Sequence, residues 1–165
     1  MAKKEAEASK EAAVQEGTAA VKNEKAEKFQ KFLADNKINV FETEQLTDDF
    51  QTVVFRSRIE TKGQILPMAV IIDNSVFTII RTQIVAGLPS EKQVQITASL
   101  NELNEKYKIF KYYLRQDGVV YLDVCLPFVD ESFDGNMIQL MLNVLVQHLN
   151  DTYSDIMEGV WAKNK

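Results

Sequence analysis

The sequence holds a single histidine, His148, and a single cysteine, Cys125, so these residues bound the metal and nucleophile chemistry that it can support. A structural zinc site needs three or four convergent ligands, and a catalytic triad needs a nucleophile beside an oriented base. Val144 and Thr152, four residues to either side of His148, supply neither a metal ligand nor a carboxylate. We therefore expect no zinc site, no catalytic residue and no enzyme activity, with His148 at a structural or surface position.

Cys125 stands between two apolar residues, Val124 and Leu126. In such a stretch cysteine usually serves as a small buried hydrophobic residue. As the only cysteine, it has no partner for an intramolecular disulfide. We predict a buried Cys125 without a reactive role.

Two further stretches have the composition of ligand sites without their spacing. Asp130, Glu131 and Asp134 are close in sequence, but the alternating oxygen ligands and distal glutamate of an EF-hand are missing. Asp134 is instead well placed as the N-cap of a following helix. Residues 87–90 precede another predicted helix, but they lack a Walker lysine and a G-x-G-x-x-G motif. We expect no bound metal, phosphate or cofactor.

Residues 106–115 interleave basic and aromatic side chains. Basic grooves with stacking aromatic residues can hold single-stranded nucleic acid. This pattern suggests an alternative function as a single-stranded nucleic-acid-binding accessory protein, carried by Lys108, Lys111, Tyr113 and Arg115. The same alternation more simply predicts a strand with one wet face and one buried face. A net charge of −5 also disfavours a phosphate-backbone partner.

The stretch 99–126 organises the predicted fold. A helix is expected to end in it before Lys108. Strands at 109–116 and 119–126 then flank Asp117-Gly118, the strongest hairpin signal in the chain. The second strand is largely apolar on both faces, which predicts that both of its faces are covered.

Upstream, three β-rich stretches separated by turn residues predict an antiparallel meander. These strands span 50–61, 64–72 and 76–84. Pro67 has no N–H to give to a ladder, so we expect it at a sheet edge or a bulge.

Apolar residues at helical spacing predict three helices, at 24–36, 90–107 and 136–162. Ser90 and Gln93 match a capping box at the start of the second helix. The apolar face of this helix is predicted to comprise Val94, Ala98, Leu100, Leu103 and Tyr107. The element order α-β-β-β-α-β-β-α indicates an α+β fold in which helices pack on an antiparallel sheet.

The 165 residues are 45% hydrophobic, which is enough for a packed core. Residues 1–23 are rich in Ala, Glu and Lys and predict a flexible or partly helical tail before a single domain at 24–165. No apolar run fits a secretory signal or a membrane span, so we expect a soluble, cytoplasmic protein without a membrane partner.

Three motifs in order carry a family resemblance: Leu-Asn-Glu-Leu-Asn at 100–104, Arg-Gln-Asp-Gly-Val-Val at 115–120 and Leu-Pro at 126–127. Their order and spacing resemble the YbjN family of bacterial sensory transduction regulators, over residues 24–162. The resemblance implies a fold like that of the class I chaperones of type III secretion. It also implies a dimer that binds extended peptide, and it brings no catalytic residues.

The last predicted helix and strand 119–126 carry more apolar surface than one sheet face needs. Exposed apolar patches mark interfaces, and in a symmetric dimer one patch serves both copies. The same surface could instead belong to the monomer's own core or form a groove for a client. The predicted packing and interface residues are Val120, Leu122, Ile138, Leu142, Leu145 and Leu149. We expect a non-enzymatic protein- or peptide-binding, regulatory domain that forms a homodimer.

Overall fold

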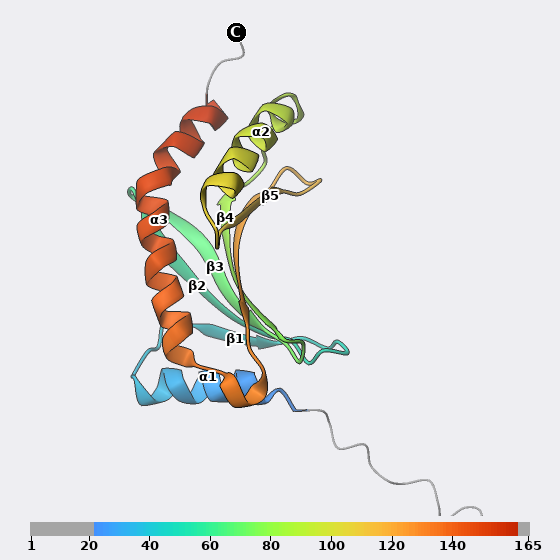
Figure 1. The fold of residues 1–165 in the computed structure, drawn as a ribbon, viewed down its shortest axis with the longest axis vertical. Helices are drawn as coiled ribbons and strands as arrows, with labels where there is room; N and C mark the ends of the chain where they lie inside the picture. Colours follow the sequence, from blue (N-terminus) through green and yellow to red (C-terminus); the bar gives the residue numbers. More distant parts are fainter. Residues whose placement is uncertain (1–21, 162–165) are drawn as a thin grey trace, which may run out of the picture.

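The computed structural model describes residues 22–161, which form a six-stranded antiparallel sheet with three α-helices (Figure 1). The strand order across the sheet is β1-β2-β3-β4-β6-β5. The elements in chain order are α1 (Glu24–Asp35), β1 (Glu42–Gln45), β2 (Val53–Thr61), β3 (Gln64–Ile72), β4 (Phe77–Val85), α2 (Ser90–Lys106), β5 (Lys111–Leu114), β6 (Val120–Pro127), the 3-10 turn η1 (Asp130–Ser132) and α3 (Gly135–Trp161). The predicted α+β class is confirmed, and the predicted element order holds apart from one additional short strand, β1.

Residues 1–21 of the predicted tail and residues 162–165 of the predicted domain lie outside the described residues. Within residues 22–161, helix α1 is anchored from its first turn. The Asn23 side chain accepts a hydrogen bond from the Ala26 amide (2.9 Å) and donates one to the Ile72 carbonyl (3.0 Å). The buried Lys25 ammonium donates to the carbonyls of Ser75 and Phe128, and burial lowers the pKa of Lys25. Helix α1 is thereby tied to three segments distant in sequence.

One face of the sheet is apolar and fully covered. The register places Phe55, Val70, Ile80 and Val124 in one row across β2, β3, β4 and β6, and all four are buried. The helices pack on this face: the Phe29 ring of α1 meets the Phe55 ring edge-on, with 4.8 Å between centroids. In Figure 1, α3 runs along the sheet while α1 crosses its lower end and α2 lies beside β5. We call this the core face.

The six residues predicted for packing and assembly all lie on the core face or on the side of α3 that covers it. Val120, Leu122, Ile138, Leu142, Leu145 and Leu149 are all buried. Full burial of one such aliphatic side chain contributes about 1.5–3 kcal/mol. These residues therefore form the monomer's own core, and a second copy cannot reach them in the folded state.

The opposite face, which we call the open face, carries mostly exposed and half-buried side chains, whereas the three described helices pack against the core face (Figure 1). The prediction that both faces of strand 119–126 are covered is therefore wrong for its outer face. Cys125 lies there and is exposed, not buried as predicted. The apolar neighbours Val124 and Leu126 point to the core face because side chains alternate along a strand.

Helix α2 differs from its prediction in both its cap and its buried face. No side chain caps its first turn. The side-chain amide of Gln93 donates instead to the Leu88 carbonyl (3.4 Å). Ile96 and Leu100 are buried, whereas Val94 is 84% exposed. Two residues turn an α-helix by about 200°, so a helix seated through Ile96 points Val94 and Ala98 to solvent.

The strand boundaries follow the predicted turns. The Asp117-Gly118 hairpin joins β5 to β6, and Gly118 takes a left-handed conformation (φ 77°) while its carbonyl accepts from the Leu88 amide (2.8 Å). Pro67 lies just beyond the β3–β4 ladder, which starts at Met68. At Pro67, strand β3 therefore has a paired neighbour on one side only, which is β2. The short strand β1 was not predicted, because its four residues are polar and exposed.

We predict that Gly135→Ala lowers stability. An added Cβ at Gly135 would lie 2.4 Å from the Phe32 ring, where α3 begins against α1. Overpacking of this kind costs about 1–3 kcal/mol. Gly159→Ala is the matched control, because its Cβ would meet only the flexible end of Ile96 at 3.4 Å. Urea unfolding of both variants measures the difference; equal free energies of unfolding would contradict the close approach.

Candidate functional site

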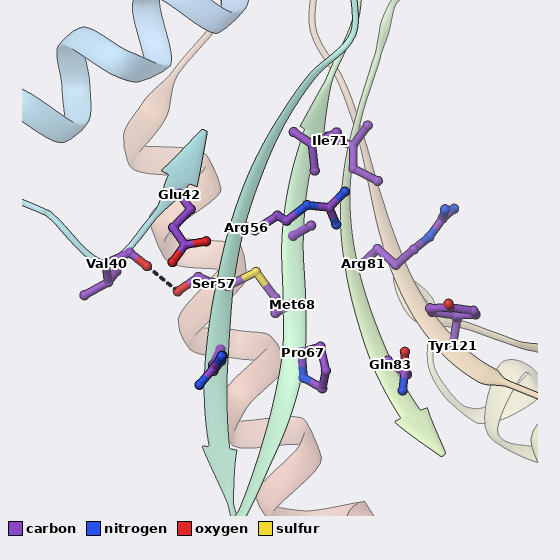
Figure 2. Close-up of a pocket in the computed structure, with 13 residues that line it drawn as sticks. Val40, Glu42, Arg56, Ser57, Pro67, Met68, Ile71, Arg81, Gln83 and Tyr121 are labelled. Atoms are coloured by element: carbon purple, nitrogen blue, oxygen red, sulfur yellow. Dashed lines mark hydrogen bonds between the residues drawn. The ribbon is translucent and has the colours of Figure 1, made fainter. Parts of the chain in front are cut away.

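The open face is hollowed by a groove of about 820 Å³, which we call the sheet groove. Figure 2 shows its walls, with Arg56 and Pro67 on β2 and β3, and Arg81 and Tyr121 on β4 and β6. Helix α3 lies behind the sheet in this view. The groove is therefore formed by strand side chains together with Val40, from the loop before β1.

One row of cross-strand neighbours places charges at regular intervals across the open face. From β1 to β5 the row consists of Glu42, Arg56, Ala69, Arg81, Asp123 and Lys111. Directly opposed side chains have Cβ atoms about 4.5–5.5 Å apart. Ala69, with only a methyl group, therefore forms a low floor between two arginines.

Arg81 is held rigidly. Its guanidinium donates two hydrogen bonds to the Asp123 carboxylate, at 2.9 and 2.8 Å, and Asp123 is only 6% exposed. The Tyr113 hydroxyl donates to the same carboxylate (3.2 Å). The rings of Tyr113 and Tyr121 lie 5.8 and 5.6 Å from the guanidinium carbon. Such a bidentate pair fixes the orientation of an arginine at a surface.

The pKa shifts in this cluster follow from its contacts. The hydrogen bonds to Asp123 raise the pKa of Arg81 further, so the guanidinium stays charged. Burial, together with the negative charge of Asp123, raises the pKa of Tyr113 to about 12. The tyrosine is therefore a neutral hydrogen-bond donor at physiological pH.

Two more arginines face the sheet groove from β2. Arg56 donates to the Glu44 carboxylate at 2.8 and 2.6 Å, but both side chains are exposed, which makes the pair weak. Arg58 is exposed two residues further along. The groove lining thus contains three arginines and one acidic residue, Glu42, in a chain whose net charge is −5. Arg56 and Arg81 are each paired with a carboxylate, so the groups open to an acidic ligand are Arg58 and the guanidinium N–H groups that those pairs leave over.

The structure brings most of the predicted nucleic-acid residues to the open face. Lys111, Tyr113 and Arg115 alternate along the chain there, and Lys108 lies in the bend before β5. The Tyr113 ring stacks on Tyr121 with 5.7 Å between centroids, and the Lys111 ammonium lies 5.6 Å from its centre. The tyrosine is therefore already packed between protein groups.

His148 lies in a buried aromatic cluster on the core face. Its Nε2 is 2.8 Å from the Tyr112 hydroxyl, and the Phe110 ring stacks on its imidazole with 3.8 Å between centroids. Tyr107 meets the imidazole edge-on, at 4.4 Å. Only 6% of His148 is exposed, and burial lowers its pKa to about 4. We call Tyr107, Phe110, Tyr112 and His148 the His148 cluster.

No group of three or more His, Cys, Asp or Glu side chains within residues 22–161 is arranged to hold a metal ion. The acidic stretch forms η1, and the Asp134 carboxylate accepts from the Asn136 amide (2.9 Å) at the start of α3. This contact agrees with the predicted N-cap. Among the described helices, none has the length and apolar character of a membrane span.

The sequence analysis missed Arg56, Arg58, Arg81 and Asp123 as site residues. They come from three strands that are distant in the chain, and only the register of the sheet brings them into one surface. The available signal was the placement of charged residues inside otherwise apolar strands. A buried carboxylate such as Asp123 needs a partner, which could have pointed to an arginine on a neighbouring strand.

The fold and the site define an α+β domain with one sheet face covered by helices and one left open. The profile of the YbjN family, described as "Putative bacterial sensory transduction regulator", matches residues 26–157. This chain belongs to the YbjN family. A search of curated proteins finds no match.

We predict that acid destabilises the protein through His148. Its pKa is about 4 in the folded state and about 6.5 when unfolded, so the unfolded state binds more protons between these values. Stability is fully present above about pH 6.5 and falls as the pH drops towards 4, by on the order of 2–3 kcal/mol. Urea unfolding at pH 7 and pH 4.5 measures the loss.

His148→Phe is the control, because it keeps an aromatic ring in the cluster but cannot titrate. Other groups also contribute to acid sensitivity, so the informative quantity is the difference between the two proteins. The variant should lose less stability on acidification than the wild type. An identical loss in both would show that His148 does not titrate in this range.

Proposed function

We propose that this chain is a non-enzymatic regulatory domain that binds a protein or peptide, and that the sheet groove holds an acidic segment of the partner. The observation that carries the proposal is the uncovered open face with three arginines lining one groove. Membership in a family described as a regulator supports a role exerted by binding.

The physical properties of the groove suit a peptide. Binding energy at protein interfaces concentrates in Arg, Tyr and Trp side chains that are already ordered. Arg81 is fixed by Asp123, so its engagement costs little side-chain entropy. Val54, Pro67 and Ile71 add apolar surface beside the arginines. A segment that alternates acidic and apolar residues satisfies both features.

Single-stranded nucleic acid is the second candidate, through Lys108, Lys111, Tyr113 and Arg115. The cations on the open face favour it. The packing of the Tyr113 ring against Tyr121 and Lys111 favours the peptide instead, because base stacking needs a free aromatic face.

We further propose that the chain forms a homodimer. The six residues predicted for its interface are buried in the core, so the dimer must use other surfaces. Met137 and Leu140 on α3 are exposed and adjacent in space, one helical turn apart. Light scattering at tens of micromolar should give twice the mass of the chain, and Leu140→Asp should reduce it. A strict monomer contradicts the dimer.

We predict that Ala69→Glu weakens peptide binding in the sheet groove. The new carboxylate would stand between Arg56 and Arg81 and compete with an acidic ligand for both. A randomised peptide library selected on the full chain should yield acidic, partly apolar peptides. Their affinity should fall at least about tenfold, or ~1.4 kcal/mol, in the variant.

Val94→Glu is the matched control, because it adds the same charge at an exposed position of α2. It should bind the selected peptides as the wild type does. Selection of no peptide, or equal binding by both variants, contradicts the proposed function.

A further inference from the structure

Half of β6 has a neighbour on only one side. β4 pairs with β6 from Val120 to Pro127, whereas β5 pairs with it only from Val120 to Asp123. Within residues 22–161 no strand covers the second edge of β6 beyond Asp123. We call residues 124–127 of that edge the free edge of β6.

The backbone groups that face the free edge follow from two hydrogen bonds. The Phe128 amide donates to the Val76 carbonyl (2.8 Å), so Phe128 faces β4. N–H and C=O groups of successive residues point to opposite sides of a strand. Val124 and Leu126 therefore also face β4, and the N–H and C=O of Cys125 face the free edge.

The pairing of β5 with β6 leads to the same conclusion, that the backbone groups of Cys125 point away from β4. The Asn104 side chain pairs with both backbone groups of Tyr112, accepting from its amide (2.7 Å) and donating to its carbonyl (3.0 Å). Tyr112 thus faces away from β6, so Lys111 and Tyr113 face towards it. By the same register, Ile109 would face Cys125, but Ile109 lies outside the ladder.

The His148 cluster lies at the point where β5 starts. Phe110 stacks on His148, and Tyr107 packs edge-on against the same imidazole. These contacts hold the side chains of both residues against α3. The predicted strand from 109 to 116 is shortened in the structure to Lys111–Leu114.

A second groove, of about 390 Å³, lies beside the free edge. Met141 of α3 and Ile109 of the bend before β5 line it, together with Ile79 and Cys125 of the open face. Ile109 is 45% exposed. Lys108 and Lys111 also line this groove and give its mouth a positive charge.

We propose that the free edge of β6 accepts an extended segment of the partner as an added strand. The segment pairs with the Cys125 backbone, places an apolar side chain between Ile109 and Met141, and directs acidic residues to Lys108 and Lys111. Strand addition of this kind draws affinity from main-chain hydrogen bonds and specificity from alternate side chains. The inference rests on the proposed protein-binding function and adds a second contact with the partner, separate from the sheet groove.

The other sheet edges are poorer acceptors for such a segment. Asn104 occupies the outward backbone groups of Tyr112 in β5. β1 presents the carboxylates of Glu42 and Glu44, which repel an acidic strand. The free edge of β6 is the described edge that combines open backbone groups, apolar surface and positive charge.

The test uses the full chain and an end-capped synthetic peptide, Asp-Val-Thr-Val-Thr-Val-Asp. The peptide should bind and slow hydrogen exchange of the Cys125 amide at least about tenfold, because that amide gains an acceptor. A peptide N-methylated at alternate residues along either edge cannot pair and should bind at least about tenfold more weakly. Nuclear magnetic resonance of the labelled protein measures both the exchange rate of the Cys125 amide and the affinity for each peptide.

Charge reversal tests the role of the two lysines that line the groove beside the free edge. The double variant with Lys108→Glu and Lys111→Glu should weaken binding about tenfold at low salt, while Lys31→Glu, on exposed α1 surface, should leave it unchanged. Cys125→Pro removes the outward N–H on a side that the β4 ladder does not use, and it should weaken peptide binding at least about tenfold.

Three results would overturn the added strand: no binding at millimolar peptide, equal binding of the N-methylated peptides, or a Cys125 amide that exchanges equally fast with and without peptide. If peptides still bind in the sheet groove and bind more weakly to Ala69→Glu, the proposed function survives and only the strand inference fails. Protection of Cys125 in the peptide-free dimer, lost on dilution, would assign the edge to a second copy and also overturn the proposal.

Discussion

The packing of α3 on the core face is the interaction on which the rest of this structure depends. Ile138, Leu145 and Leu149 are fully buried along it. The start of the helix receives Phe32 of α1 against Gly135, and its middle carries His148. One helix therefore sets the position of α1, seals the core and holds the segment before β5.

The placement of the helices on one face has consequences for the other. The side chains on the open face have no covering layer of helices. Many of them are charged, and those in the row through Ala69 lie beside partners on neighbouring strands. The Arg81–Asp123 pair within this row is partly buried and fully hydrogen-bonded. In the proposed function, this fixed arrangement lowers the entropic cost of binding an acidic segment.

Local signals in the sequence were sufficient for the element order. The Asp-Gly and Lys-Gly turns, the β-branched strands and the apolar period of the last helix each identify an element without reference to the others. The turn at Gly118 and the N-cap at Asp134 are of this kind. The resemblance to the YbjN family, carried by residues 100–127, was also correct.

Features that depend on which face a residue occupies could not be predicted from local pattern. Cys125 is flanked by two apolar residues that face the core, yet strand alternation places Cys125 itself on the open face. The apolar arc of the last helix was expected to meet a second copy, with the monomer's own core as an alternative; the sheet and the other two helices bury most of it, while Met137 and Leu140 stay exposed. The shortened β5 starts directly after Phe110, whose ring stacks on His148, thirty-eight residues further along the sequence. Each of these outcomes is decided by tertiary packing.

Hydrogen exchange of the ligand-free chain tests the central claim most directly, because it reports whether the free edge of β6 is open. The amides of Val124 and Leu126 should be strongly protected by β4, whereas the Cys125 amide between them should exchange as a solvent-facing group in the monomer. Equal protection of the three amides in the monomer would show that the edge is already paired, and it would contradict the account.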